Sequence, residues 1–358
     1  MKSIIVTKFV EDLSDLTVTP APNPPASVNT ITIAIHSAAL NYVDILYSRG
    51  QHQNNRSSLV SPPFTLGLEY SGTILSSPPF FPHPPGTRVF GEALGSFATH
   101  LVLPFSPALL DSMHRIPPGW SFDHAASIPA TLPVSYGALV ARGGLRGGET
   151  VLIHGAAGGL GVMAVQVALA LGAGRVYCTA RGRRKCDVVV GLEGIRPEYK
   201  GRVKVFDTAA GGDWWEIVME ETGRKGVDVV FDSVGMVDQS LKCLAHRGRV
   251  LVVGFAGRDG DSMEGIKMNR VLLKQAQIIG YRYGESGRRF PEEKARIWEE
   301  LWPLIEEGRI QPVVFDEEYK GLESVPRALK DLEERKVWGK AVVRVDDGKE
   351  ADVVQPRL

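Results

Sequence analysis

Length and charge limit what this chain can be. Its 358 residues exceed one ordinary domain and predict two. Lysine plus arginine equals aspartate plus glutamate at 41 each, so no overall field attracts nucleic acid or an anionic membrane, and we expect a small-molecule partner. The three cysteines include no C-x-x-C pair, which indicates a reducing compartment, and the expected location is the cytoplasm.

Short β-branched runs interrupted by proline and glycine occupy residues 1–124. Examples are TITIAIHSAAL at 30–40 and HLVLPF at 100–105, a pattern that predicts small antiparallel strands with irregular loops. The start, MKSIIVTKFVEDLS, has no long apolar core and predicts a first strand rather than a signal peptide. We interpret the proline-dense stretch at 76–91 as a surface loop inside the same domain, because strand-like residues resume directly after it.

From about residue 125 onward, apolar runs alternate with helical segments. Their near-continuous valine and isoleucine indicates a parallel sheet covered on both faces, the doubly wound α/β arrangement. The predicted strands are 151–155, 175–180, 202–208, 227–235, 249–255 and 277–284. After them we expect helices at 292–308 and 325–336 and a closing strand at 340–345.

The stretch IHGAAGGLG at 153–161 joins the first of these strands to a helix. A glycine-rich turn at that place points backbone N–H groups and the positive end of the helix at a diphosphate. Against the pattern G-x-G-x-x-G, Ala156 replaces the first glycine, while Gly158 and Gly161 are present. A tight turn that needs glycine only for packing is the alternative. The strand before the loop and the helix after it favour a dinucleotide cradle. Its expected contacts are Ala157, Gly158, Gly159 and Leu160.

The end of the second strand indicates which dinucleotide binds. An NAD site usually places an acidic residue there for the ribose 2′-hydroxyl. This chain reads TARGRRK at 179–185, with Arg181, Arg183, Arg184 and Lys185 and no acid before Asp187. Arg181, Arg184 and Lys185 are the expected cofactor contacts. Guanidinium groups bind a 2′-phosphate in a forked geometry, so NADPH is preferred over NADH. A solvated basic turn is the alternative.

Two further loops follow predicted strands at the same edge of the sheet. Ser233 and Val234 come after the fourth strand, and Gly254 and Phe255 after the fifth. An open α/β sheet binds its ligand at the carboxyl ends of its strands, so we expect these residues to contact the cofactor. Ordinary turn chemistry is the alternative.

Eight stretches along most of the chain together resemble the medium-chain dehydrogenase/reductases, and within them the zinc-free quinone oxidoreductase or zeta-crystallin-like branch. The resemblance implies a GroES-like β-rich catalytic domain at 1–124, a Rossmann NADP-binding domain at 125–284 and a return to the catalytic domain at 285–358. The stretches are 39–50, 63–74, 125–139, 151–168, 227–235, 248–255, 269–280 and 339–345.

The resemblance also bears on metal chemistry. Zinc-dependent relatives supply ligands at points corresponding to Asn41, to Leu68 within Gly-Leu-Glu, and to a later cysteine, and an amide and a leucine stand at the first two here. Zinc catalysis needs three N, S or O ligands around an open position, so we expect no metal site. Without a Lewis acid the acceptor must already be activated, as in a quinone or an α,β-unsaturated carbonyl.

The resemblance further implies individual roles. Asn41 corresponds to an asparagine that orients the nicotinamide or the substrate carbonyl, although a turn-stabilising amide is equally expected there. His52 stands where some relatives place a tyrosine, and Tyr47 could substitute, with simple surface placement the alternative for both. Lys340 corresponds to a lysine near the cofactor phosphates, or is merely solvated. Val134 replaces a threonine that relatives place near the nicotinamide amide.

These expectations combine into a zinc-independent NADPH-dependent oxidoreductase that transfers hydride to a quinone or an α,β-unsaturated carbonyl. An enoyl-thioester reductase of a lipid or polyketide pathway is the close alternative, and an NADPH-binding structural or sensing protein without turnover is the alternative of another class. A homodimer is expected through the apolar edge strand at 277–284. The last three residues, Pro-Arg-Leu, only loosely match a peroxisomal address.

Overall fold

The computed structural model describes residues 1–22, 27–257 and 265–345, so the last residues, with the loosely address-like tripeptide, lie outside it. The chain forms two compact units. The first unit comprises Met1–Ser127, Asp316–Lys336 and Ala341–Leu358, and the second comprises Ile128–Phe315 and Val337–Lys340.

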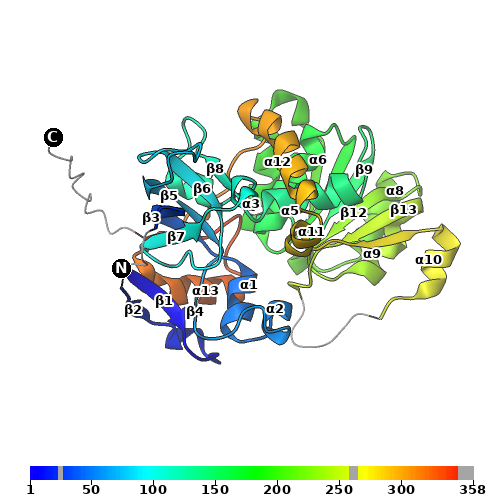
Figure 1. The fold of residues 1–358 in the computed structure, drawn as a ribbon. Coiled ribbons are helices and arrows are strands. Elements are labelled where there is room, and N and C mark those ends of the chain that lie inside the picture. Colours follow the sequence, from blue (N-terminus) through cyan, green and yellow to red (C-terminus); the bar gives the residue numbers. More distant parts are fainter. Residues whose placement is uncertain (23–26, 258–264, 346–358) are drawn as a thin grey trace. The chain divides into compact units, whose positions relative to one another are not determined.

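The first unit is built on antiparallel strands (Figure 1). Its larger sheet has the order β15-β16-β3-β5-β6-β8, with β7 also paired to β3. Alternate residues of β3, such as Ile31, Ile33 and Ile35, are buried, which is the period of a strand with one face on the core. The strands are β3 (Thr30–Ala39), β5 (Glu69–Ser76), β6 (Arg88–Glu92), β7 (His100–Pro104), β8 (Met113–Arg115), β15 (Tyr319–Lys320) and β16 (Val342–Arg344).

Shorter elements complete this unit. A small sheet joins β2 (Val18–Pro20), β1 (Lys2–Val6) and β4 (Phe64–Thr65), so the expected first strand is confirmed. The proline-dense stretch connects β5 to β6, and its expected place as a loop within this unit is also confirmed. The helices are α1 (Tyr42–Ser48), α2 (Gln53–Arg56), α3 (Pro107–Leu110), α4 (Phe122–Ala126) and α13 (Val325–Glu333), with short 3-10 turns at Leu13–Asp15 and Leu322–Ser324.

The second unit contains a six-stranded parallel sheet in the order β11-β10-β9-β12-β13-β14. This order matches the doubly wound dinucleotide-binding fold, in which the order reverses between the first strand and the fourth. The strands are β9 (Thr150–Ile153), β10 (Arg175–Ala180), β11 (Val203–Asp207), β12 (Val227–Asp232), β13 (Leu244–Val252) and β14 (Gln277–Gly280). Each expected strand is present, so the predicted fold class is confirmed.

Helices cover this sheet, and its core joins strand residues such as Leu152, Val230 and Val250 to helix residues such as Trp214 and Leu241. The helical elements are α5 (Leu132–Tyr136), a π-helix (Gly137–Arg142), α6 (Gly159–Ala170), α7 (Arg183–Gly191), α8 (Trp214–Glu221), α9 (Val237–Cys243), α10 (Met268–Lys274), α11 (Tyr283–Arg289) and α12 (Pro291–Glu306), with 3-10 turns at Leu192–Ile195, Pro197–Tyr199 and Thr208–Ala210.

Two expected boundaries are corrected. The second unit extends to Phe315, so the return to the first unit begins at Asp316 and not at residue 285. The reason is that α12 buries Ile297, Trp298 and Leu301 and packs against α5 and α11 of the second unit. The last parallel strand ends at Gly280 and not at residue 284, because α11 begins at Tyr283.

Candidate functional site

The glycine loop begins with a tight turn at Gly155, one residue before the position that the pattern G-x-G-x-x-G assigns to its first glycine. Gly155 has φ +61°, in the left-handed region that favours glycine, and a Cβ there would lie 2.9 Å from Cγ2 of Val234. Gly155 therefore makes the tight turn that the pattern assigns to its first glycine. Ala156, which occupies the pattern's first position, is buried and needs no such freedom.

The other two glycines also have distinct roles. A Cβ at Gly161 would lie 2.2 Å from the carbonyl oxygen of Gly155, so only glycine allows α6 to pack this closely on the turn. Gly158 precedes the first residue of α6, and a Cβ there would meet only ordinary contact at 3.4 Å. Tight turn, open approach and close packing are the three features that a diphosphate site on a helix N-terminus requires, so the loop fits that group.

The loops after β12 and β13 lie against the glycine loop, as expected for Ser233, Val234 and Gly254. Ser233 Oγ donates to the carbonyl oxygen of His154 at 3.3 Å, and Val234 contacts Gly155. The amides of Ala256 and Gly257 donate to the carbonyl oxygens of Ser233 and Val234, each at 3.0 Å. The loops at the carboxyl ends of three neighbouring strands therefore form one surface. Phe255 projects from it with 49% of its surface exposed.

Asp232, which we did not predict, organises this surface. It is fully buried at the end of β12, and its carboxylate accepts from the backbone amides of Val234, Gly235 and Met236 at 2.9, 2.8 and 2.6 Å. Three N–H donors on one carboxylate fix the turn that carries Val234. The aspartate just before Ser-Val-Gly was the available sequence signal.

Buried hydrogen bonds also lie beneath the loop. His154 Nδ1 is 2.9 Å from Thr179 Oγ1, and His154 Nε2 is 2.8 Å from Ser240 Oγ. Ser240 Oγ donates to the carbonyl oxygen of Met236, so it accepts from His154, which is then protonated on Nε2 and neutral. Burial lowers the pKa of His154, which keeps the ring neutral.

The basic segment follows β10 as expected. Arg181 and Arg184 are exposed, and Lys185 is half-buried. Between them Gly182 has φ +88°, and its amide donates to the carboxylate of Asp207 at 2.8 Å. Asp207 ends the neighbouring strand β11 and fixes the start of this turn.

Lys340 and Thr131 border the first turn of α6. An ideal Cβ at Gly159 would lie 3.5 Å from Cδ of Lys340, 3.4 Å from the carbonyl oxygen of Gly339 and 3.3 Å from Cγ2 of Thr131. Lys340 is 4% exposed, so it is not the solvated lysine that the alternative described. Val134 lies on α5, and Thr131 directly precedes that helix. The sequence offered no signal for Thr131, because its proximity depends on the tertiary fold.

In the first unit, Asn41 forms hydrogen bonds with two acidic side chains, those of Asp44 and Glu69. It directly precedes α1, its amide N–H donates to Asp44 Oδ2, and its side-chain Nδ2 donates to Glu69 Oε2, both at 2.7 Å. Glu69 is fully buried. The turn-stabilising alternative therefore describes these contacts, and the orienting role of Asn41 stays a prediction. Glu69 was not predicted.

Tyr47 and His52 meet at a second cluster in this unit. Their ring centroids are 4.4 Å apart, and Asn54 joins them: its Nδ2 donates to Tyr47 Oη at 2.6 Å and its amide N–H to His52 Nδ1 at 3.1 Å. Tyr47 is 5% exposed, so it is not a surface residue. The structure brings Tyr47 and His52 together and gives Asn41 a different partner.

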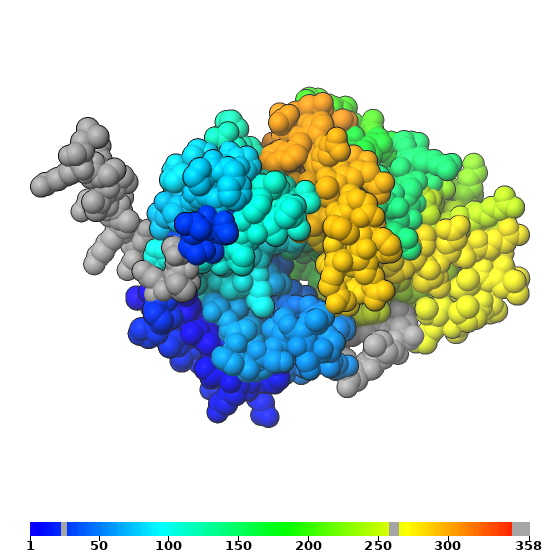
Figure 2. Space-filling model, in the orientation of Figure 1, coloured from blue at the N-terminus to red at the C-terminus, as the bar shows by residue number. Residues whose placement is uncertain are grey.

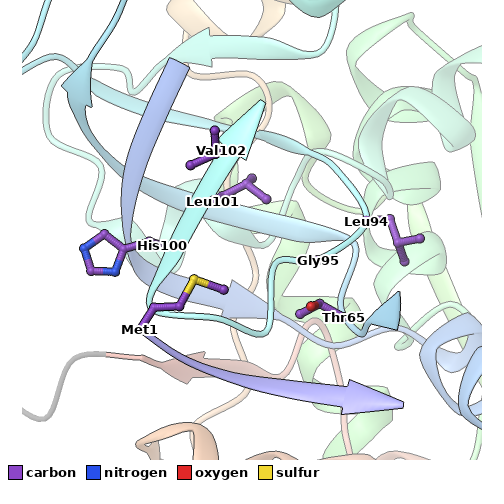
Figure 3. A pocket seen from close by; sticks show the side chains of 7 residues that line it. All are labelled: Met1, Thr65, Leu94, Gly95, His100, Leu101 and Val102. Carbon is purple, nitrogen blue, oxygen red and sulfur yellow. The ribbon is translucent and has the colours of Figure 1, made fainter. Parts of the chain in front are cut away.

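Within residues 1–22, 27–257 and 265–345, no group of three His, Cys, Asp or Glu side chains is placed to hold a metal ion. The helices in this part of the chain include none with the length and apolar character needed to cross a bilayer. A shallow pocket in the first unit, lined mainly by aliphatic groups, holds none of the expected site residues (Figure 3).

Comparisons with known proteins agree with the two units. A family model for the alcohol dehydrogenase GroES-like domain matches residues 27–105, and a model described as zinc-binding dehydrogenase matches residues 159–306. Quinone oxidoreductase-like protein 2 of Bos taurus is 29% identical over 332 residues, covering 91% of this chain and 87% of the bovine protein.

Two further proteins are similar over most of the chain. The spectinabilin polyketide synthase system protein NorB of Streptomyces orinoci is 33% identical over 307 residues, which cover 84% of this chain but only 13% of that much longer protein. A mycobacterial protein whose structure was solved in complex with NADPH is 25% identical, with a TM-score of 0.79 over 96% of this chain and 99% of the other. The chain belongs to the medium-chain dehydrogenase/reductase superfamily, and its quinone oxidoreductase-like relatives support the zeta-crystallin-like branch.

Proposed function

We propose that this protein is a zinc-independent oxidoreductase that uses NADPH to reduce a quinone or an α,β-unsaturated carbonyl. The observation that carries the proposal is the glycine loop at the N-terminus of α6, with a basic segment and no acidic residue directly after β10. The solved NADPH complex of a 25%-identical relative supports the choice of cofactor.

The second unit's groups would hold the cofactor. The amides at the start of α6, around Gly158, Gly159 and Leu160, would bind the diphosphate, and Arg181 and Arg184 would bind the 2′-phosphate. NADPH, when bound, supplies a hydride, and a proton from a side chain or water completes the two-electron reduction of the acceptor. Val234 and Gly254, in the loops that follow β12 and β13 at the carboxyl edge of the sheet, would border the bound dinucleotide.

Side chains of the first unit support the proposed acceptor class. Leu68 cannot ligate a metal, so a hydrogen-bond donor has to stabilise the developing negative charge. Tyr47 Oη and His52 Nε2 are the candidate donors, since Nδ1 of the histidine already accepts from Asn54. A neutral hydrogen-bond donor suffices without a metal ion where conjugation spreads the negative charge to a carbonyl oxygen, as in a quinone or an enone.

The experiment is a substrate panel. Purified protein is mixed with NADPH and, in turn, with quinones, enones, enoyl thioesters and simple ketones, and loss of the nicotinamide absorbance is followed. We expect oxidation with quinones or enones and none with simple ketones. Activity that disappears with a chelator and returns with zinc would contradict the zinc-independent mechanism.

An enoyl-thioester reductase is the second candidate, and the similarity to a polyketide synthase system protein favours it. It predicts a kcat/KM for an enoyl thioester at least about tenfold above that for the matching enone without the carrier. A protein that binds NADPH and oxidises it with none of these acceptors would instead be a structural or sensing protein.

Self-association is a separate proposal. Strand β14 is the edge of the parallel sheet. The helix that directly precedes it, α10, exposes Met268, Leu272 and Leu273 at 65, 77 and 74%. The part of the chain that contains both elements is yellow in Figure 2 and reaches the surface there. An open edge next to exposed apolar side chains favours pairing with a second copy. A sizing column should show a dimer, and Ile278→Lys on β14 should shift it to monomer, whereas Leu110→Lys in the first unit should not. A monomeric wild type would contradict the proposal.

The cytoplasm remains the proposed location. Cys178, Cys186 and Cys243 are all free thiols, and two of them are buried. Burial raises the pKa of the Cys243 thiol to about 12, so it is unreactive at neutral pH. Free, unreactive thiols suit a reducing compartment.

A further inference from the structure

A short segment near the end of the chain pairs with the glycine loop. The amide of Gly339 donates to the carbonyl oxygen of Ala157 at 2.7 Å, and Gly339 forms a parallel bridge with Gly158. On its other side the segment pairs with residues 313–315: the amide of Lys340 donates to the carbonyl oxygen of Val313, and the carbonyl oxygen of Lys340 accepts from the amide of Phe315, each at 2.9 Å. We call residues 311–315 and 337–340 the bracket.

The bracket is tightly packed where it meets the loop. Gly339 has φ +56°, and a Cβ there would lie 2.4 Å from the carbonyl oxygen of Val313. No larger residue fits without moving one of the two segments. The position of Lys340, the next residue, is therefore fixed relative to the first turn of α6, where the stem of Lys340 lies beside Gly159.

One buried side chain ties the bracket to the body of α6. Gln166 is completely buried, and it is a polar residue in a helix whose neighbouring residues are apolar. Its Oε1 accepts from the amide of Gln311 at 2.7 Å, and its Nε2 donates to the carbonyl oxygen of Gln311 at 3.0 Å and to that of Val162 at 3.2 Å. A single primary amide thus pairs with both polar groups of one backbone residue.

The connection runs from α6 through Gln166 to Gln311, along the bracket to Lys340, and back to the N-terminus of α6. We propose that Gln166 is a positioning residue for NADPH, acting through the bracket to hold the Lys340 ammonium at the diphosphate end of α6. The inference rests on the proposed function, and it assigns to a buried amide a role in cofactor affinity. A merely structural Gln166 would change stability and leave the contribution of Lys340 intact.

A double-mutant cycle separates these roles. Gln166→Met keeps about the same side-chain volume and removes the side-chain donor and acceptor that pair with Gln311. Titration of NADPH by protein fluorescence gives dissociation constants for the wild type, Gln166→Met, Lys340→Met and the double variant. We expect NADPH to bind about tenfold more weakly to Lys340→Met and about fivefold more weakly to Gln166→Met. The double variant should be no worse than Lys340→Met alone, because both changes remove one contact.

Two further variants test the mechanism. Val165→Ala removes buried volume from the adjacent position of α6 and keeps the Gln166 hydrogen bonds to Gln311, so it should lower the melting temperature and leave the affinity unchanged. Gln166→Glu can donate to the Gln311 carbonyl only when protonated, so its NADPH affinity should rise as pH falls, relative to the wild type.

The outcomes are distinct. A wild type that does not bind NADPH would overturn the proposed function and this inference with it. If the wild type binds and Gln166→Met binds equally well, or if the two single effects multiply in the double variant, only the positioning role of Gln166 is overturned.

Discussion

The glycine loop of the second unit and the Asn41 region of the first unit are built in opposite ways. In the glycine loop the backbone forms the candidate site, and glycines at 155, 158 and 161 serve the turn, the open approach and the packing. In the first unit side chains form the candidate site, and those of Asn41 and Tyr47 already hydrogen-bond to Glu69 and Asn54.

This difference shows where local rules suffice. A backbone site depends on conformation, which glycine and strand patterns specify over a few residues. A side-chain site depends on partners that arrive from distant segments, as Glu69 reaches Asn41 from another strand. Substitutions that act on one region and leave the other unchanged can test the comparison.

The largest effect is expected at Gly161. Alanine would place its Cβ 2.2 Å from the Gly155 carbonyl oxygen, so either the turn or α6 must move. Overpacking of this kind should cost about 3 kcal/mol of unfolding free energy and abolish NADPH binding. Thermal unfolding and NADPH titration are the measurements. At Gly191, where a Cβ meets nothing within 4 Å, alanine should leave both nearly unchanged, and equal behaviour of the two variants would refute this account.

Asp232→Asn should have the next largest effect. Both carboxylate oxygens of Asp232 accept hydrogen bonds from backbone amides. Asparagine keeps one of these oxygens and replaces the other with an NH2 group, which cannot accept. We expect this to lower the free energy of unfolding by about 2 kcal/mol. Because that turn carries Val234, NADPH affinity should fall together with stability. Asp228→Asn is the control at the other end of β12, where the carboxylate accepts the Thr150 amide at 2.8 Å, and it should lower stability alone.

The basic segment predicts a change in cofactor preference. Loss of both Arg181 and Arg184 to alanine should weaken NADPH binding about tenfold or more while NADH binding stays the same, because only NADPH carries the 2′-phosphate. Parallel titrations at low and moderate salt measure this. Arg183→Ala is the matched control, since that side chain is 92% exposed and pairs with Asp187 at 3.7 Å. Equal affinity for the two cofactors in the wild type would exclude the preference.

The smallest effect is expected at Asn41. Alanine removes one donor from the buried carboxylate of Glu69 and should cost about 1 kcal/mol of stability. NADPH affinity should change less than about twofold, because the groups proposed to bind the cofactor belong to the second unit. Glu69→Gln, which still offers Asn41 an acceptor oxygen, should be milder. A large loss of NADPH affinity in Asn41→Ala would instead show that this amide reaches the cofactor.

The sequence by itself determined the doubly wound sheet, the antiparallel first unit, the glycine loop and the basic segment after β10. These features follow from local patterns: valine-rich runs spaced by helices, short β-branched runs interrupted by proline and glycine, and a turn that opens a helix. It also placed Ser233 and Val234 at the correct edge, because the carboxyl ends of parallel strands meet on one side of a sheet.

Only the tertiary structure decided which residues share a partner. It moved the tight turn from Ala156 to Gly155, attached α12 to the second unit, and joined Gln166 to Gln311, residues 145 positions apart. It also gave Asn41 a buried carboxylate and placed Tyr47 inside the first unit. Contacts between distant segments depend on how whole elements pack, and no local pattern of side chains records that packing.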